Sequence, residues 1–182
     1  ARNVALAALA VTTLHERGAV DRAPDVAAGA ARAFLPGRFQ VLRARSGRVV
    51  VLDVGHNPEA LHATLDVFEA VLPGARPQVV LGLLRDKKLD GVGERLARLA
   101  HEIVLTSPHV ERAWDPRAAR ALFPEGARCR VEPRVEAAVG RVLDTGSRPV
   151  LLLGSHYLLG EALPALASRL GTPAADLLRP GS

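Results

Sequence analysis

Residues 48–58 read RVVVLDVGHNP, and this stretch decides the fold class. The apolar run before Asp53 predicts a strand, because β-branched residues and leucine favour buried strands. Asn57 is a typical helix N-cap, and Pro58 predicts the first turn of a helix, where proline is favoured. A strand that passes into a helix within five residues is the repeating unit of α/β proteins.

The same alternation extends to both sides of this stretch. Upstream, Ser46-Gly47 separates the runs Phe39–Arg45 and Arg48–Asp53, which predicts a β-hairpin. Downstream, the strands are continuous apolar runs, which is typical of strands buried on both faces. The expected fold class is α/β: a Rossmann-like, mostly parallel sheet of about six strands, with helices on both faces and an N-terminal antiparallel hairpin. The later strands are expected at 77–82, 102–106, 127–132 and 148–153, and the helices at 58–72, 89–100, 116–122, 133–144, 156–170 and 173–178.

The motif Leu35-Pro36-Gly37-Arg38 interrupts the chain sharply, and we place a domain boundary there. Residues 36–182 are expected to form the α/β domain. Residues 1–35 begin with a helix over 1–17 that stops at Gly18, and we interpret them as the end of another domain. The chain begins at Ala1 and contains no methionine, so we expect a fragment or a processed chain.

Composition excludes several classes of protein. The 182 residues are 48% hydrophobic, but no apolar run approaches the roughly 18 residues of a membrane span. No basic segment followed by an apolar one predicts a secretory signal. The single cysteine, Cys129, excludes a disulfide framework and a multi-cysteine metal site. We expect a cytoplasmic protein without a membrane partner.

The net charge of +5 comes from the first quarter of the chain. Residues 1–48 hold eight basic and three acidic groups, whereas residues 49–182 hold sixteen of each. One interpretation is a local basic edge around Arg38, Arg43, Arg45 and Arg48 that meets phosphates of a small molecule; the alternative is a solvated basic face. Aromatic residues make up only 3%, which leaves few stacking platforms, and no nucleic-acid partner is expected.

Candidate site residues lie where strands end, because ligands of parallel sheets bind beyond the carboxyl ends of the strands. Asp53 can accept bonds from ribose hydroxyls, and His56 lies beside a helix N-terminus, which favours anions. Arg38 can hold phosphate with its planar guanidinium, and Ser155 can donate to a carboxylate. Three of them have a structural alternative: Asp53 organises a turn, Arg38 is a surface arginine, and Ser155 caps a helix.

Other site types are excluded by the residues around the candidates. A nucleophile elbow needs glycine two positions to either side of the serine, and Ser155 has Leu153 and Tyr157 there. The G-x-G at 91–93 does not follow a strand, and no P-loop lysine motif occurs. No two histidines have the H-x-x-x-H spacing, so no zinc site is predicted. The segment 82–87 is interpreted as an ordinary charged connection rather than a ligand loop.

Four motifs together resemble one known family. They occur in the family's order and comprise LPGRF at 35–39, LDVGHNP at 52–58, GLLRDK at 82–87 and GSHYLLGE at 154–161. They resemble the C-terminal part of folylpolyglutamate synthase/dihydrofolate synthase, in the Mur-ligase superfamily. The opening NVALA at 3–7 resembles the last helix of that family's ATPase domain, so the resemblance assigns residues 1–35 to the end of the central ATPase domain and 36–182 to the glutamate ligase domain.

The resemblance implies an ADP-forming ligase that joins L-glutamate to a folate-type carboxylate through an acyl phosphate. It implies ATP contacts at Asn3, Arg38 and Asp53, and glutamate contacts close to the chemistry at His56 and Ser155. We assign these two to glutamate placement or polarisation rather than to proton transfer. ATP and Mg²⁺ are the implied cofactors, with the magnesium ligands outside this chain and no metal ligand within it. The implied partners are ATP, L-glutamate and a folate-type acceptor, and a monomer is expected.

The sequence departs from the family at two positions and leaves alternatives open. Lys88 stands where the family often has aspartate, and His156 stands where it usually has leucine. The residues do not separate dihydrofolate synthesis from polyglutamate extension. A Mur ligase acting on cell-wall precursors and a free-standing Rossmann-like binding module are the two alternatives. We expect this chain alone not to turn over substrate.

Overall fold

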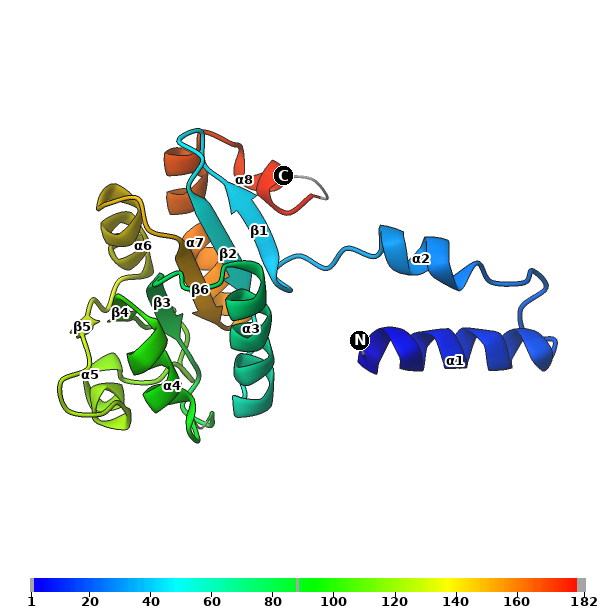
Figure 1. The fold of residues 1–182 in the computed structure, drawn as a ribbon, viewed down its shortest axis with the longest axis horizontal. Coiled ribbons are helices and arrows are strands. Elements are labelled where there is room, and N and C mark those ends of the chain that lie inside the picture. Colours follow the sequence, from blue (N-terminus) through cyan, green and yellow to red (C-terminus); the bar gives the residue numbers. More distant parts are fainter. Residues whose placement is uncertain (1, 88, 180–182) are drawn as a thin grey trace. The chain divides into compact units, whose positions relative to one another are not determined.

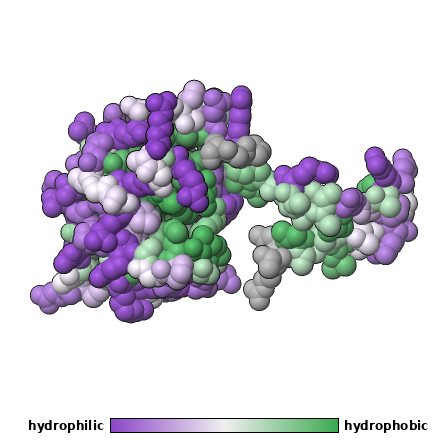
Figure 2. All heavy atoms as spheres, turned by 45° about the horizontal axis from the view of Figure 1, so that its top comes forward, coloured by the Kyte–Doolittle hydropathy of each residue, from purple (hydrophilic) through white to green (hydrophobic). Residues whose placement is uncertain are grey.

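The computed structural model describes residues 2–87 and 89–179 and divides the chain into two compact units, residues 1–35 and 36–182. The first unit consists of helices α1 (Arg2–Glu16) and α2 (Val26–Arg32). The Asp25 side chain caps α2 by accepting the backbone N–H of Ala28 at 2.8 Å. Several large apolar side chains of this unit are exposed, and Figure 2 shows them as green surface. The assignment of this unit to an ATPase domain remains a prediction.

The second unit is built on one six-stranded sheet, which confirms the expected fold class (Figure 1). Its strand order is β1-β2-β6-β3-β4-β5. The first pair forms the antiparallel hairpin, and all other neighbours are parallel. The strands are β1 (Gln40–Arg43), β2 (Val49–Asp53), β3 (Gln78–Gly82), β4 (Glu102–Leu105), β5 (Cys129–Val131) and β6 (Val150–Gly154).

Helices cover both faces of the sheet because successive strand residues point to opposite sides. Val51 and Leu151 pack in one cluster with α3 and α4, whereas Leu52 and Leu152 pack in the other with α6, α7 and α8. The first face carries α3 (Pro58–Val71), α4 (Val92–Leu99) and α5 (Pro116–Ala119), which continues into the 3₁₀ turn η1 (Arg120–Leu122); the second carries α6 (Val135–Asp144), α7 (His156–Leu170) and α8 (Ala174–Leu177).

The element order agrees with the sequence analysis, and the differences lie at element ends. The helix expected over 89–100 begins at Val92, because Gly91 has a φ of +71° and cannot continue a right-handed helix. The strand expected over 127–132 is only three residues long and lies at the sheet border. No helix among the described residues is long and apolar enough to cross a bilayer.

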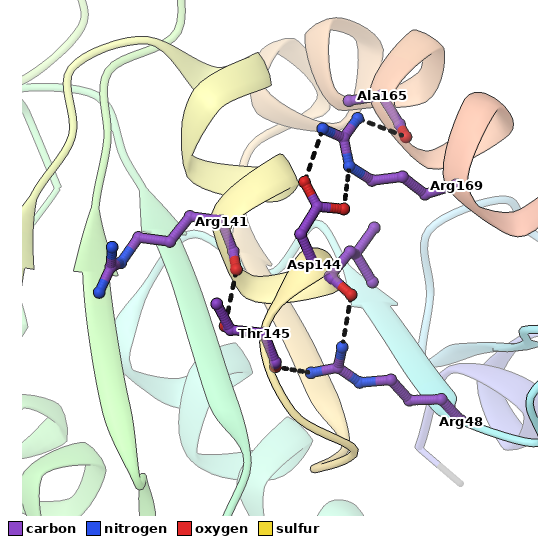
Figure 3. A network of polar contacts seen from close by, with 7 residues as sticks. Arg48, Arg141, Asp144, Thr145, Ala165 and Arg169 are labelled. Atoms are coloured by element: carbon purple, nitrogen blue, oxygen red, sulfur yellow. Dashed lines mark hydrogen bonds and ion pairs between the residues drawn. The ribbon is translucent and has the colours of Figure 1, made fainter.

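Arg48 corrects the interpretation of a single basic edge. Its side chain is buried at the edge where the parallel strands begin, which we call the amino edge. It donates to the carbonyl oxygens of Leu143 (2.9 Å), Arg148 (2.6 Å) and Thr145 (3.3 Å), and two of these bonds are drawn in Figure 3. Its Nη2 also donates to Gln78 Oε1 at 2.7 Å. Arg48 therefore joins strand starts and a loop, and its guanidinium is used by these four hydrogen bonds.

The hairpin register separates the remaining arginines as well. Arg43 pairs with Val49 at the start of β2, whereas Gln40 pairs with Leu52 near its end. Arg38, two residues before Gln40, thus lies at the opposite edge of the sheet, which we call the carboxyl edge. The four arginines of the first quarter do not form one phosphate-facing edge, because a hairpin carries its two ends to opposite sides of the sheet.

Candidate functional site

The carboxyl edge brings together two loops that carry predicted site residues. β2 and β6 are adjacent and parallel, and Asp53 is in register with Leu153. The loop after β2, with His56, and the loop after β6, with Ser155, therefore leave the sheet next to each other. They enter α3 and α7, which cover opposite faces. A point where connections diverge to opposite faces is where open α/β sheets form ligand crevices.

Both oxygens of the Asp53 carboxylate accept hydrogen bonds from backbone N–H groups. Oδ2 accepts the N–H of Phe39 at 2.8 Å, and Oδ1 accepts the N–H of Gly55 at 2.6 Å. The residue is only 7% exposed. These two hydrogen bonds join the start of β1 to the loop after β2. The ATP contact of Asp53 remains a prediction.

The turn that carries Arg38 is fixed to the same loop. Gly37, with a φ of +67°, accepts the N–H of Val54 at 2.7 Å, and a Cβ there would lie 2.6 Å from Leu159. Phe39 has a φ of +44°, which is uncommon for a residue with a side chain, and its bond to Asp53 supports that conformation. Arg38 itself is exposed, and among the described residues its side chain has no hydrogen bond or ion pair. Its guanidinium remains available for a ligand.

His56 is half-buried at the entrance to α3. Its Nδ1 lies 3.1 Å from the carbonyl oxygen of Val54. Because a carbonyl only accepts, Nδ1 carries the hydrogen in this contact, and in the neutral ring Nε2 has the free lone pair. Asn57 then caps α3 by accepting the N–H of Ala60 at 2.8 Å. The imidazole is thus oriented by the backbone, with its other nitrogen left for a ligand.

Ser155 holds the equivalent position on the neighbouring strand. Its Oγ accepts the N–H of Leu158 at 3.2 Å as the N-cap of α7, and the residue is 5% exposed. The hydroxyl hydrogen is not used in this bond and can be donated. Gly154 before it has a φ of +145°, and a Cβ there would lie 1.9 Å from the carbonyl oxygen of Gly82. The close approach of β6 to β3 therefore requires glycine at this position.

The loops after β3 and β4 are joined to each other. Leu84 forms a bridge with Ala113, and the N–H of Arg85 donates to the carbonyl of Arg112 at 2.8 Å. Asp86 pairs with Lys87 at 2.9 Å, and this hydrogen bond holds the pKa of the Asp86 carboxyl below its usual value. These contacts agree with a structural role for the segment 82–87. Lys88 lies outside the described residues.

Sequence reasoning assigned no role to a cavity of about 720 Å³ at the same edge. It lies between the loop after β4 and the start of α6. The Glu161 carboxylate, from the second turn of α7, accepts the N–H of His109 and so ties this loop to α7. Glu161 belongs to the motif GSHYLLGE at 154–161. Its partner His109 is 52 residues away in the sequence, so no local pattern reveals the contact. The cavity is lined by Ser107, Pro108, His109, Val110, Glu111, Pro133, Arg134, Val135, Glu136 and Glu161.

The structure thus groups Arg38, Asp53, His56 and Ser155 at one edge of one unit. Asn3 lies on α1 in the other unit, and its side chain is not among those described. Within residues 2–87 and 89–179, no three His, Cys, Asp or Glu side chains are placed to hold a metal ion. The roles of all five residues toward ligands remain predictions.

Comparison with known sequences gives a family match over most of the second unit. The family described as "Mur ligase, glutamate ligase domain" matches residues 37–156. A UDP-N-acetylmuramyl-tripeptide synthetase of Leifsonia xyli is 37% identical over 140 residues, which is 74% of this chain and 27% of that protein. The dihydrofolate synthase/folylpolyglutamate synthase of Escherichia coli is 36% identical over 85 residues, 47% of this chain and 20% of that protein.

Comparison with solved structures supports the fold. A bifunctional folylpolyglutamate synthase/dihydrofolate synthase from Yersinia pestis, complexed with AMPPNP and Mn ion, matches with a TM-score of 0.64 and 23% identity. The match covers 81% of this chain and 35% of that one. The chain therefore matches only 20% to 35% of the length of these three relatives.

Proposed function

The chain belongs to the Mur ligase family through its glutamate ligase domain, and from this premise we propose that it acts in an ATP-dependent ligase that joins L-glutamate to a folate-type carboxylate. The observation that carries the proposal is the joint position of Arg38, His56 and Ser155 on the loops around β2 and β6. These loops offer a cation, an oriented imidazole and a hydroxyl beside the N-termini of two long helices, which suits anionic reactants.

The proposed reaction forms an amide from two poor partners. A carboxylate is a weak electrophile, so the terminal phosphoryl group of ATP is first transferred to the acceptor carboxylate, giving an acyl phosphate and ADP. The glutamate nitrogen then attacks the acyl carbon, the carbon–oxygen bond to phosphate breaks, and phosphate and a proton leave. Such catalysis depends mainly on positioning and on stabilising charge.

Each residue at the carboxyl edge has a part in this proposal. Arg38 pairs with phosphate oxygens through its unoccupied guanidinium. Asp53 holds the Arg38 turn against the His56 loop and contacts ATP. His56 and Ser155 hold the incoming glutamate, with the serine hydroxyl donating to a carboxylate. Asn3 contacts ATP from the first unit. Mg²⁺ would neutralise phosphate charge in this reaction, and no cluster of His, Cys, Asp or Glu among the described residues is placed to hold it.

The cavity beside α7 is suited to the zwitterionic end of an amino acid. Arg134 offers a cation to a carboxylate, whereas Glu111, Glu136 and Glu161 offer carboxylates to an ammonium group. It opens at the same edge as His56 and Ser155. This lining supports an amino-acid substrate more than a purely anionic one.

A cell-wall precursor is the second candidate acceptor, with another amino acid in place of glutamate. The tripeptide synthetase match favours it, because that match covers 74% of this chain, whereas the folate synthase match covers 47%. The four motifs at 35–39, 52–58, 82–87 and 154–161 favour a folate-type acceptor. Acceptor choice is the point on which the two proposals differ.

The test uses the complete product of the gene that contains this chain. ADP release is measured with dihydropteroate and L-glutamate, and separately with a UDP-linked muropeptide and its amino acid. Turnover with the first pair alone supports the folate proposal, turnover with the second pair alone overturns it, and turnover with neither overturns the ligase itself.

Variants of the same product test the residue assignments. Arg38→Ser should lower kcat/KM by about a hundredfold, the loss typical of one charge-stabilising group. His56→Ala and Ser155→Ala should raise the KM for glutamate more than the KM for ATP. His62→Gln, on the same helix α3 but outside the loop, is the matched control and should leave both constants unchanged. Unchanged kinetics in Arg38→Ser, His56→Ala and Ser155→Ala would show that the assignment is wrong.

A further inference from the structure

A second polar region lies at the amino edge, opposite to the proposed ligase site. A hollow of about 490 Å³ opens beside the first residues of β4 and β5 and is lined by His101, Glu102, Arg128, Cys129 and Arg130. A smaller hollow of about 120 Å³ shares Arg128 and reaches Arg76. Since parallel strands begin at one edge and end at the other, this region is separate from the loops that carry His56 and Ser155.

Three arginines from three different loops lie at the amino edge. Arg76 and Arg148 each lie two residues before the paired residues Gln78 and Val150, and Arg128 lines both hollows. Arg76 precedes β3, Arg128 precedes β5 and Arg148 precedes β6. Partial burial lowers the pKa of the His101 imidazole, and the positive charges of all three arginines lower it further. Residues that are far apart in the sequence thus place several positive charges around one histidine.

The acid in the larger hollow does not compensate these charges. Glu102 Oε1 lies 3.3 Å from Arg130 Nε and 3.3 Å from Arg141 Nη2, so it is already shared by two other arginines. Burial of the Cys129 thiol raises its pKa, so this neighbour adds no negative charge near neutral pH. The region around His101 therefore carries a local excess of positive charge.

Among the described residues, only Arg76 of these three arginines has a hydrogen-bond partner for its side chain. Arg76 donates to the carbonyl oxygen of Ala100 at 3.0 Å, where it complements the C-terminal end of α4. Arg128 and Arg148 are exposed, and within the described part of the chain neither side chain has a hydrogen bond or an ion pair. Like charges held together without a counter-charge attract an anion from solution.

We propose that Arg76, Arg128 and Arg148 form a binding site for a compact phosphate-bearing anion, independent of the ligase site at the carboxyl edge. The planar guanidinium matches phosphate oxygens in paired hydrogen bonds, which makes arginine the preferred residue for this chemistry. Neither hollow is lined by Phe, Tyr or Trp. A single-stranded nucleic acid, which needs stacking platforms, fits the site less well than a small di- or triphosphate group.

The test measures pyrophosphate binding to the whole 182-residue chain by isothermal titration calorimetry. The wild-type chain should bind pyrophosphate saturably. Arg128→Ser/Arg148→Ser should weaken binding about tenfold or more, the loss expected when charge-assisted hydrogen bonds are removed. Both positions are exposed, so the fold should be retained, which circular dichroism confirms.

A matched control separates a site from a general charge effect. Arg43→Ser/Arg117→Ser removes the same charge from two exposed arginines on β1 and α5, outside the loops that carry Arg76, Arg128 and Arg148. This control should change the dissociation constant less than twofold. Equal weakening in both double variants, or no weakening in Arg128→Ser/Arg148→Ser, would overturn the proposal.

Two further experiments test where pyrophosphate binds and which anions the site accepts. The same comparison is repeated in an Arg38→Ser background, which removes the cation proposed for the carboxyl edge. Arg128→Ser/Arg148→Ser should still weaken pyrophosphate binding in this background; no further weakening would show that the anion occupies the carboxyl edge, and would overturn a separate site. Sulfate should bind more weakly than pyrophosphate, and an oligothymidylate should not compete with it. Equal affinity for sulfate, or displacement by the oligonucleotide, would contradict a site for a compact phosphate anion. None of these outcomes depends on ligase activity.

Discussion

Arg38 and Arg48 lie at the two ends of one hairpin and have opposite surroundings. Arg48 is buried, and its guanidinium donates to three carbonyl oxygens and one side-chain amide (Figure 3 shows two of these bonds). Burial lowers the pKa of its guanidinium. Arg38 is exposed at a tightly fixed turn, with no partner among the described residues. Satisfied hydrogen bonds thus identify Arg48 as a structural arginine, whereas the fixed turn and unpaired guanidinium of Arg38 leave it available for the proposed ligand contact.

The largest effect is expected at the carboxyl edge, from Gly154→Ala. The new Cβ would lie 1.9 Å from the Gly82 carbonyl oxygen at a φ of +145°, so the central strand pair must separate. We expect a loss of more than about 4 kcal/mol in unfolding free energy, measured by urea denaturation. Gly160→Ala is the control, because nothing lies within 4 Å of its Cβ and alanine in a helix adds about 0.5–1 kcal/mol. A folded, stable Gly154→Ala would contradict the close approach of β3 and β6.

At the amino edge, Arg48→Met should cost about 3 kcal/mol in unfolding free energy. The substitution leaves the carbonyl oxygens of Leu143 and Arg148 without the donor they now have, and unsatisfied buried groups cost about 1–3 kcal/mol each. Arg43→Met, at an exposed position of the same hairpin, should stay within about 0.5 kcal/mol. Equal denaturation midpoints for the two variants would show that the buried hydrogen bonds of Arg48 do not stabilise the fold.

Asp53→Asn tests whether the carboxyl edge also has a structural requirement. Both carboxylate oxygens accept backbone N–H groups, and an amide turns one of these acceptors into a donor facing a donor. We expect a loss of about 2 kcal/mol, together with increased hydrogen exchange at Phe39. Asp115→Asn is the control, because asparagine caps a helix as well as aspartate does. Normal stability in Asp53→Asn would mean that the turn carrying Arg38 is held by other contacts.

The smallest effect concerns acid stability at the amino edge. Partial burial and the charges of Arg148, Arg128 and Arg76 lower the pKa of His101, whereas Glu102 opposes them. The unfolded chain therefore binds this proton more readily, and stability falls as the pH drops below about 6.5 and through the lowered pKa. In His101→Gln, the decrease in Tm between pH 7.5 and pH 5.5 should be smaller than in the wild type. A decrease of the same size would show that His101 contributes nothing to acid sensitivity.

Local signals predicted the elements well, because each depends on neighbouring residues. The Pro58 and Asn57 signals predicted the start of α3, and the helix expected over 156–170 is α7. The carboxyl-edge cluster also followed from local reasoning, since strand ends of a parallel sheet converge.

What the sequence could not reveal depends on contacts across the fold. The partners of Arg48 lie 30 to 100 residues away, so sequence alone grouped it with Arg38 as part of one basic edge. Glu161 reaches His109 across 52 residues. Backbone N–H groups occupy both Asp53 oxygens only because the chain turns at Phe39. No local preference predicts the positive φ of Phe39.

The position of β6 has a consequence for how the chain acquires its structure during synthesis. This strand is the last in the sequence but the third in the sheet, where it alone connects β2 to β3. Until residues 150–154 leave the ribosome, no strand pairs the hairpin with the β3–β4–β5 group. A nascent chain stopped before Val150 would thus expose two unpaired strand flanks, which β6 pairs in the folded sheet.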